Sequence, residues 1–257
     1  MLTHALLRLP GQNLAAGLSQ AGEGAPDVER ALEQHQRYCE ALADAGLSLT
    51  VLPADPRFPD GCFVEDTAVV TGRGAIVARP GAPARRGEVD IIESALRGLF
   101  PALTRIQAPG TVDAGDVCEA DGHFLIGLSA RTNESGAHEL AGYLADLGYR
   151  ADVVDIRGSR GLLHLKTGIA YLGEGRMLAS ADFPRHSALA AYEIVEVPAA
   201  ERYAANALRV NDRVLVAAGY PVTQAAIEAL GFNTVMLEMG EFRKLDGGLS
   251  CLSLRWQ

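Results

Sequence analysis

The sequence has 257 residues, of which 48% are hydrophobic and 21% are charged. These values are typical of a soluble globular protein and exclude a disordered chain, a coiled coil and a fibrous repeat. Lys and Arg number 23 and Asp and Glu number 32, which gives a net charge of −9. This negative balance argues against nucleic acid or an anionic membrane as a partner and favours a cationic ligand.

The chain holds four cysteines: Cys39, Cys62, Cys118 and Cys251. None forms a CxxC pair, and none lies near a second Cys or a His at zinc-finger spacing. So few cysteines in a long chain predict a reduced, intracellular protein. The first residues lack the basic head and unbroken apolar run of a signal peptide, and no window approaches the ~20 apolar residues of a membrane span. We therefore expect a cytoplasmic protein with no membrane attachment.

One order of elements recurs along the chain. Each of four copies opens with a hairpin, in residues 67–78, 116–127, 168–180 and 206–218. A helix with apolar residues at helical spacing follows in three copies, in residues 88–99, 134–147 and 223–230. Each copy closes with a strand, in residues 103–107, 151–156, 193–197 and 234–237. The hairpin turns are rich in Gly, Asn and Asp, which indicates residues with positive φ.

The two ends of the chain supply a fifth copy. Residues 249–256 alternate in polarity and predict a C-terminal strand, while residues 3–8 predict an N-terminal one. A long helix in residues 26–45 and a strand in residues 47–52 follow the latter. Five like units, the last shared by both termini, predict a closed α/β ring without exposed sheet edges, formed as a single domain over residues 1–257.

The connections between these elements are expected to carry function. The conspicuous ones are residues 10–26, 53–66, 108–116, 158–166 and 241–251. Cys251 follows a Gly-rich stretch that lets the backbone approach a ligand, although a cysteine in an alternating strand is also typical of a small buried hydrophobe. His164 lies in a short apolar run closed by a turn, where it is either a general base or a core residue bonded to the backbone.

Carboxylates gather in two of these connections. Asp113 and Asp116 flank an Ala-Gly pair before a strand, and one of them could orient a histidine, unless they only form a turn. Asp60, Glu65 and Asp66 share a loop with Phe63. Three crowded carboxylates repel one another unless a cation lies between them, and an aromatic ring beside them suits the planar face of a guanidinium.

Two arginine sites each stand between a hairpin and its helix. Arg85 lies in the stretch Arg-Arg-Gly, and Arg131 lies in Ser-Ala-Arg-Thr-Asn. A guanidinium is suited to bidentate capture of a carboxylate, although solvent-exposed arginine near a helix start is the plainer interpretation.

Seven blocks together resemble one family, the dimethylarginine dimethylaminohydrolases of the guanidino-group-modifying (amidinotransferase-like) superfamily. The blocks are FPDGCFVED (58–66), RRGE (85–88), VDAGD (112–116), SARTN (129–133), LHLKTG (163–168), AANALRVN (204–211) and KLDGGLSC (244–251). The resemblance runs over essentially the whole chain. It implies a five-bladed, pseudo-symmetric α/β propeller (pentein fold), which agrees with the number of repeats counted independently.

The resemblance also implies a set of roles. Cys251 is then the nucleophile, His164 the acid and base, and Asp113 the acid that orients the histidine. Residues implied to bind the guanidinium are Asp60, Glu65, Asp66 and, by stacking, Phe63. Residues implied to bind the amino-acid end are Arg85 and Arg131 through the carboxylate, Leu245 through its backbone carbonyl, and Leu18 from a covering loop.

The implied reaction is hydrolysis of a methylated arginine to citrulline through a thiouronium on Cys251, without metal or other cofactor. Alternatives are a deiminase of the same superfamily acting on arginine or agmatine, and a non-catalytic guanidine-binding protein. Two placed arginines would be pointless for agmatine, which has no carboxylate. A homodimer is compatible with the sequence.

Overall fold

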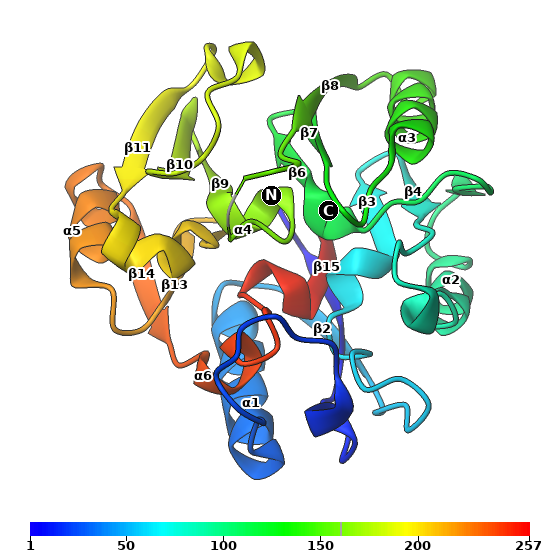
Figure 1. Cartoon of the computed structure of the whole chain (residues 1–257), viewed down its shortest axis with the longest axis horizontal. Helices are drawn as coiled ribbons and strands as arrows, with labels where there is room; N and C mark the ends of the chain where they lie inside the picture. The colour runs from blue at the N-terminus through cyan, green and yellow to red at the C-terminus, as the bar shows by residue number, and fades with distance from the viewer. Residues whose placement is uncertain (160) are drawn as a thin grey trace.

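In the computed structural model, which describes residues 1–159 and 161–257, fifteen strands form five three-stranded sheets arranged as the blades of a ring (Figure 1). The inner strands are β3 (Ala68–Thr71), β6 (Val117–Ala120), β9 (Ile169–Gly173), β12 (Leu208–Val210) and β15 (Ser253–Trp256). The middle strands are β4 (Gly74–Val77), β7 (His123–Leu128), β10 (Arg176–Ser180), β13 (Arg213–Ala217) and β1 (His4–Arg8). The outer strands are β5 (Leu103–Arg105), β8 (Arg150–Asp155), β11 (Glu193–Val197), β14 (Asn233–Leu237) and β2 (Ser48–Leu52).

All five blades have one pairing pattern. The middle strand is antiparallel to the inner strand and parallel to the outer one. A parallel pair needs a crossover connection. In four blades a helix supplies it: α1 (Val28–Asp44), α2 (Val89–Leu96), α3 (Glu134–Asp146) and α5 (Pro221–Ala229). The predicted order of hairpin, helix and strand is therefore confirmed, including the copy without a long helix.

The termini close the ring, as predicted. β1 lies between β15 and β2, with His4 paired to Trp256 and Leu7 to Ser253. Both chain ends accordingly lie near the centre of the molecule (Figure 1). Neighbouring blades meet through their inner strands, with β15 against β3, β6 against β9 and β9 against β12.

The four crossover helices each bury apolar residues on one face, and two of them have a side-chain cap at the N-terminal end. The Asp27 side chain accepts a hydrogen bond from the Arg30 N–H at the start of α1, and Asn133 accepts one from Gly136 at the start of α3. On α3, Leu140 and Leu144 pack in one buried cluster with β7. Burial of each such side chain is worth about 1.5–3 kcal/mol relative to exposure.

Two local expectations are wrong. The hairpin turn at Gly72 and Arg73 has no residue in the left-handed region, because the Thr71 hydroxyl accepts hydrogen bonds from the N–H groups of Arg73 and Gly74 and holds the turn. The strand predicted for residues 249–256 begins only at Ser253, and Ser250–Leu252 forms a 3₁₀ turn. The other turns do use positive φ, at Asp121, Glu174 and Asn211 among others.

Short helical turns lead into four of the inner strands: Val64–Thr67, Ala114–Asp116, α4 (Leu165–Gly168) and Ser250–Leu252. These turns contact one another at one end of the axis. Beyond these turns the inner strands line an open cavity of about 770 Å³. One further short helix, α6 (Gly240–Arg243), lies beside α1. None of the described helices has the length and apolar character needed to cross a membrane.

Candidate active site

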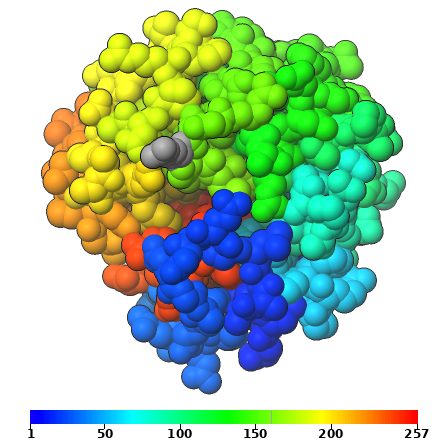
Figure 2. Space-filling model, in the orientation of Figure 1, coloured from blue at the N-terminus to red at the C-terminus, as the bar shows by residue number. Residues whose placement is uncertain are grey.

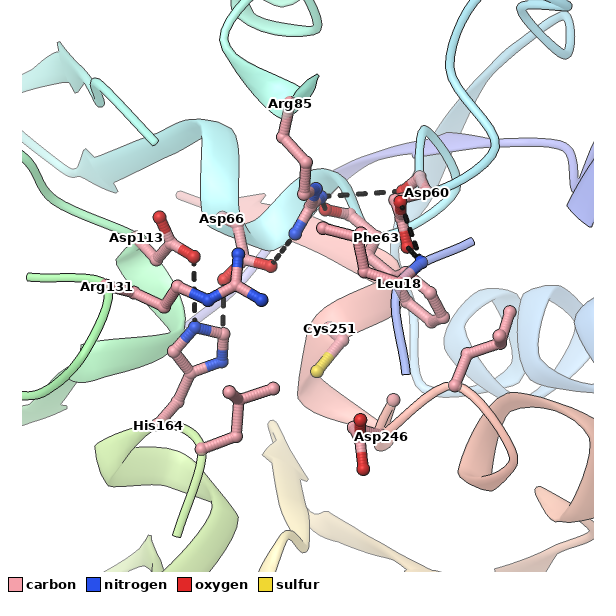
Figure 3. A pocket seen from close by; sticks show the side chains of 13 residues that line it. Leu18, Asp60, Phe63, Asp66, Arg85, Asp113, Arg131, His164, Asp246 and Cys251 are labelled. Atoms are coloured by element: carbon pink, nitrogen blue, oxygen red, sulfur yellow. Dashed lines mark hydrogen bonds and ion pairs between the residues drawn. The ribbon is translucent and has the colours of Figure 1, made fainter. Parts of the chain in front are cut away.

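A small pocket lies where the entry turns of the inner strands meet (Figure 3). Its lining includes ten of the eleven sequence-predicted site residues; Glu65 is the exception. The lining residues are Leu18, Asp60, Phe63, Asp66, Arg85, Asp113, Arg131, Leu163, His164, Leu245, Asp246, Gly247 and Cys251. Segments far apart in the sequence are thus brought together by the fivefold arrangement of the blades.

Cys251 lies in the 3₁₀ turn that precedes β15, and two glycines allow the chain to reach this position. A Cβ on Gly247 would lie 2.3 Å from a ring carbon of Phe63, and a Cβ on Gly248 would lie 2.4 Å from the Asn206 side-chain oxygen. The Gly248 N–H donates to the Cys251 Sγ at 3.4 Å. The Gly-Gly pair is therefore required by close packing around the cysteine.

The empty site keeps the Cys251 thiol protonated. Burial, with the negative charges of Glu65 and Asp66, raises the pKa of Cys251 to about 12. A thiolate is the reactive nucleophile, so a further positive charge in the pocket is needed for reaction at neutral pH.

His164 precedes α4 and is held by Asp113, whose Oδ2 lies 3.1 Å from the imidazole Nε2. The Nδ1 atom lies 3.9 Å from an oxygen of Asp66. Burial would lower the pKa of His164, but the carboxylates of Asp66, Asp116 and Asp113 outweigh it and raise the pKa to about 9. The histidine is therefore protonated at neutral pH and projects toward the same pocket as Cys251 (Figure 3).

Asp66 and Asp113 are fixed by backbone N–H groups as well as by charge. Asp66 accepts from Gly115 at 3.0 Å, and Asp113 accepts from Gly81 at 2.8 Å. A Cβ on Gly115 would lie 2.7 Å from Asp66, so only glycine fits there. Burial would raise the pKa of Asp66, but His164 and Arg85 lower it to about 2.

A metal ion could find ligands only at one cluster of the described residues. Asp66, Asp113 and His164 each offer one ligand atom, all within 4.8 Å of one another. The Nε2 of His164 and an oxygen of Asp113 already bond to each other. The absence of a metal requirement remains a prediction.

The two predicted carboxylate-binding arginines have different surroundings. Arg85 is buried against Asp66 at 2.5 Å and Glu88 at 2.8 Å, so its charge is already balanced inside the protein. Arg131 lines the same pocket, and within the described residues no carboxylate lies close enough to form an ion pair with it. Of the two, Arg131 is better placed to receive a substrate carboxylate.

The structure does not bring Glu65 into the pocket. Its carboxylate lies behind Cys251, where it accepts from the Ser250 hydroxyl at 2.7 Å and pairs with Lys166 at 2.7 Å and Arg255 at 3.2 Å. Glu65 and Asp66 are neighbours in a 3₁₀ turn, in which consecutive side chains point about 120° apart. Only Asp66 therefore faces His164.

A loop covers the pocket. The Leu18 N–H donates to both oxygens of Asp60, at 3.0 and 3.2 Å. The Ser19 hydroxyl donates to the Lys244 carbonyl, and the Gln20 N–H donates to Asp246, both at 2.6 Å. The N-terminal segment accordingly lies across the C-terminal residues on this face (Figure 2). The space in the pocket is about 30 Å³, room for one or two waters, so an amino acid can enter only if the loop or other lining side chains move.

The remaining predicted residues form the wall near this loop. Phe63 packs edge-on against Phe242, with ring centroids 6.1 Å apart. Leu245 is buried beside the covering loop, where its side chain approaches Gly17. Sequence reasoning missed Leu163, Asp246 and Gly247. Each adjoins a predicted residue, and the positive φ of Asp246, 58°, is a backbone feature that its position before two glycines could have suggested.

A five-bladed ring with a thiol, a histidine and several carboxylates in an axial pocket defines an enzyme of the guanidino-group-modifying class. No family model matches the chain. An N(G),N(G)-dimethylarginine dimethylaminohydrolase of Pseudomonas aeruginosa is 44% identical over 257 residues and all of both chains. One of Streptomyces coelicolor is 34% identical over 98% of this chain and 96% of its own.

The fold is also similar to that of a known member of this family. A solved structure of the Pseudomonas aeruginosa enzyme, a cysteine-to-serine variant complexed with citrulline, matches with a TM-score of 0.96 over 99% of each chain. This chain belongs to the dimethylarginine dimethylaminohydrolase family.

Proposed function

We propose that this protein hydrolyses N(G),N(G)-dimethyl-L-arginine to L-citrulline and dimethylamine, and N(G)-monomethyl-L-arginine to citrulline and methylamine. The observation that carries the proposal is the single pocket lined by Cys251, His164, Asp66 and Asp113. Full-length similarity to relatives of that name, one of them solved with citrulline, supports it.

Binding of the substrate is the first step. The guanidinium enters a pocket whose net charge is negative, beside Asp66 and the ring of Phe63. Arg131 holds the carboxylate of the substrate, and the Leu245 carbonyl holds its amino group. The sequence predicted that Asp60 binds the guanidinium, but its carboxylate accepts from the Leu18 N–H of the covering loop, so we assign Asp60 and Leu18 to the amino end instead. The arriving cation opposes the field of Glu65 and Asp66, which lowers the pKa of the Cys251 thiol, and the thiol proton passes to solvent.

The first chemical step forms a covalent intermediate. The Cys251 thiolate attacks the guanidinium carbon and forms a C–S bond. Protonated His164 donates its proton to the dimethyl-substituted nitrogen, the C–N bond breaks, and dimethylamine leaves. A thiouronium on Cys251 and a neutral His164 remain.

The second chemical step releases citrulline. Neutral His164 takes a proton from a water molecule, whose oxygen bonds to the same carbon. The C–S bond then breaks, the sulfur leaves as thiolate, and loss of a proton from the new hydroxyl gives the ureido group of citrulline. Asp113 and Asp66 keep the imidazole oriented and stabilise its charged form through both steps.

The test is turnover by the purified chain of dimethylarginine, monomethylarginine, arginine and agmatine, with citrulline-type product and released amine both measured. Release of dimethylamine in equal amount to citrulline supports the proposal. Turnover of arginine alone would assign a deiminase, and binding of dimethylarginine without turnover would assign a non-catalytic binding protein.

A further inference from the structure

Asp116 is a buried carboxylate close to the pocket to which no step above gives a role. It ends the 3₁₀ turn Ala114–Asp116, three residues after Asp113, and its exposed fraction is 0%. It does not line the pocket. Since an ionised carboxylate without contact to solvent is costly to bury, its hydrogen-bond partners must compensate for that cost.

One oxygen of Asp116 holds the segment that carries the base. Its Oδ1 accepts a 2.9 Å hydrogen bond from the N–H of Leu165, the residue directly after His164. The neighbouring strand leaves room for this contact, because a Cβ on Gly127 would lie 2.9 Å from the Leu165 Cβ and 3.2 Å from that oxygen. Asp116 thus fixes the start of α4, and with it the position of His164, from the side away from the pocket.

The other oxygen of Asp116 holds the segment that carries Arg131. Its Oδ2 accepts from the hydroxyls of Ser129 and Thr132, both at 2.6 Å. Each hydroxyl gives its hydrogen to Asp116 and uses its oxygen as an acceptor. The Ser129 oxygen accepts from the N–H groups of Arg131 at 2.9 Å and Thr132 at 3.1 Å.

The Thr132 hydroxyl adds a third connection. Its oxygen accepts from the N–H of Asp113 at 3.1 Å, and Asp113 in turn bonds to His164. A single carboxylate therefore reaches the base, the acid that orients it and the unpaired pocket arginine through no more than one intervening residue in each direction.

We propose that Asp116 is a positioning residue that holds His164, Asp113 and Arg131 in a fixed mutual arrangement. The roles of these three residues rest on the proposed function. Asp116 thereby fixes Arg131, at the end of the site that binds the amino acid, relative to His164, at the end where the chemistry takes place. A substrate bound by Arg131 then places its guanidinium at a set distance from the base.

The chemistry of the partners requires a carboxylate at this position. Three donors converge on two oxygens, and an ionised Asp is acceptor-only. An Asn would turn an N–H toward either the Leu165 N–H or the two hydroxyls. An apolar residue of similar size would avoid the cost of burying a charge but would leave all three donors without partners.

The two hydroxyls allow the connection to Arg131 and the connection to Asp113 to be tested separately. Ser129→Ala removes the contacts to the Arg131 segment, so KM for dimethylarginine should rise about tenfold while kcat changes little. Thr132→Val removes the contact to Asp113, so kcat should fall about tenfold while KM changes little, and Thr132→Ser should restore it. Asp116→Asn should raise KM if its amide N–H faces the two hydroxyls, and it should lower kcat if that N–H faces the Leu165 N–H.

The experiment measures kcat and KM for the wild type, these variants and a control, Ser94→Ala, on an exposed face of α2. A split between the Ser129 and Thr132 variants, with rescue by Thr132→Ser, is the expected result. Equal loss in both parameters in both variants, or lower thermal stability with unchanged kinetics, would overturn the inference even if Asp116→Asn fails to fold.

The same experiment separates this inference from the proposed function. If the wild type releases no citrulline, the proposed function fails. Calorimetry of dimethylarginine binding then tests only the connection from Asp116 to Arg131. Ser129→Ala should weaken binding about tenfold, while Thr132→Val should not. Equal binding by both variants, or no binding by the wild type, would contradict the role of Asp116.

Discussion

The Ser250 hydroxyl donates a 2.7 Å hydrogen bond to Glu65, immediately behind Cys251. The same carboxylate pairs with Lys166, two residues after His164. Glu65 thus connects the turn that carries Cys251 to the helix that follows His164, while its negative charge opposes ionisation of the thiol. The contacts of Glu65 hold the two segments in place, whereas its charge disfavours the thiolate form of Cys251.

Glu65→Gln separates these two effects. The amide oxygen can still accept from Ser250, but the charge that raises the pKa of Cys251 is removed. We expect the pH midpoint for alkylation of Cys251 by iodoacetamide to fall by about one unit. Glu33→Gln, the same change on the exposed face of α1, should leave the midpoint where it is. An unchanged or higher midpoint in Glu65→Gln would contradict this account of the thiol.

Ligand binding should ionise Cys251. The pKa of about 12 in the empty site means that the thiol is neutral at pH 7, and a bound cation lowers that pKa. Ultraviolet absorbance of the thiolate should therefore appear when a non-reacting guanidine binds near neutral pH. Cys251→Ser should give no such signal. Strong thiolate absorbance in the unliganded wild type at pH 7 would show that the protein activates the sulfur by itself.

His164 should give the activity a limit at high pH. The first step needs the protonated imidazole, whose pKa is about 9, so kcat should decline as pH rises through that value. Asp113→Asn removes one of the carboxylates that raise this pKa. It should move the decline to lower pH and reduce kcat roughly a hundredfold. A pH profile identical to that of the wild type would exclude Asp113 as the residue that orients the base.

The same histidine links stability to pH. Its pKa in the fold, about 9, lies above the ordinary value of 6.5. Protonated His164 therefore stabilises the fold fully below about pH 6.5, and this contribution is lost as pH rises through about 9. Denaturant unfolding at pH 6 and at pH 10 should show a larger drop in stability for the wild type than for His164→Gln, and equal drops would contradict it.

Asp246 should act on the covering loop. Its carboxylate accepts from Gln20 in the closed arrangement, and Asn at this position keeps the tolerance for positive φ while removing the charge. We expect Asp246→Asn to raise KM about three- to tenfold and to speed proteolysis within residues 10–26. Asp212→Asn, in an exposed hairpin turn, is the matched control. Unchanged KM and proteolysis would exclude Asp246 as a latch for the loop.

Most of the ring was predictable because its signals are local. Alternating hairpins, helical spacing and turn residues are each contained within about 15 residues, and their repeated order implied the closed topology. The 3₁₀ turn at Ser250–Leu252 was not predictable in this way. The alternating pattern continues through it, and its conformation depends on contacts with Asn206 and Glu65 from other blades.

The candidate site was predictable as a set of residues, but its orientations were not. Glu65 and Asp66 look equivalent in the sequence, and only the geometry of their turn separates their directions. The partner of Arg85 could have been found, since Glu88 lies at the i,i+3 spacing typical of an ion pair. The convergence on Asp116 involves three separate segments, residues 113–116, 129–132 and 164–165, which no local pattern reveals.

The central claim is that Cys251 carries the amidino carbon of the substrate during turnover. Acid quenching in mid-reaction, followed by mass spectrometry of the peptide containing Cys251, tests it most directly. The account predicts a mass increase on Cys251 equal to dimethylarginine minus dimethylamine, and neither adduct nor turnover in Cys251→Ser. Undiminished citrulline release by Cys251→Ser, or an adduct on another residue, would contradict it.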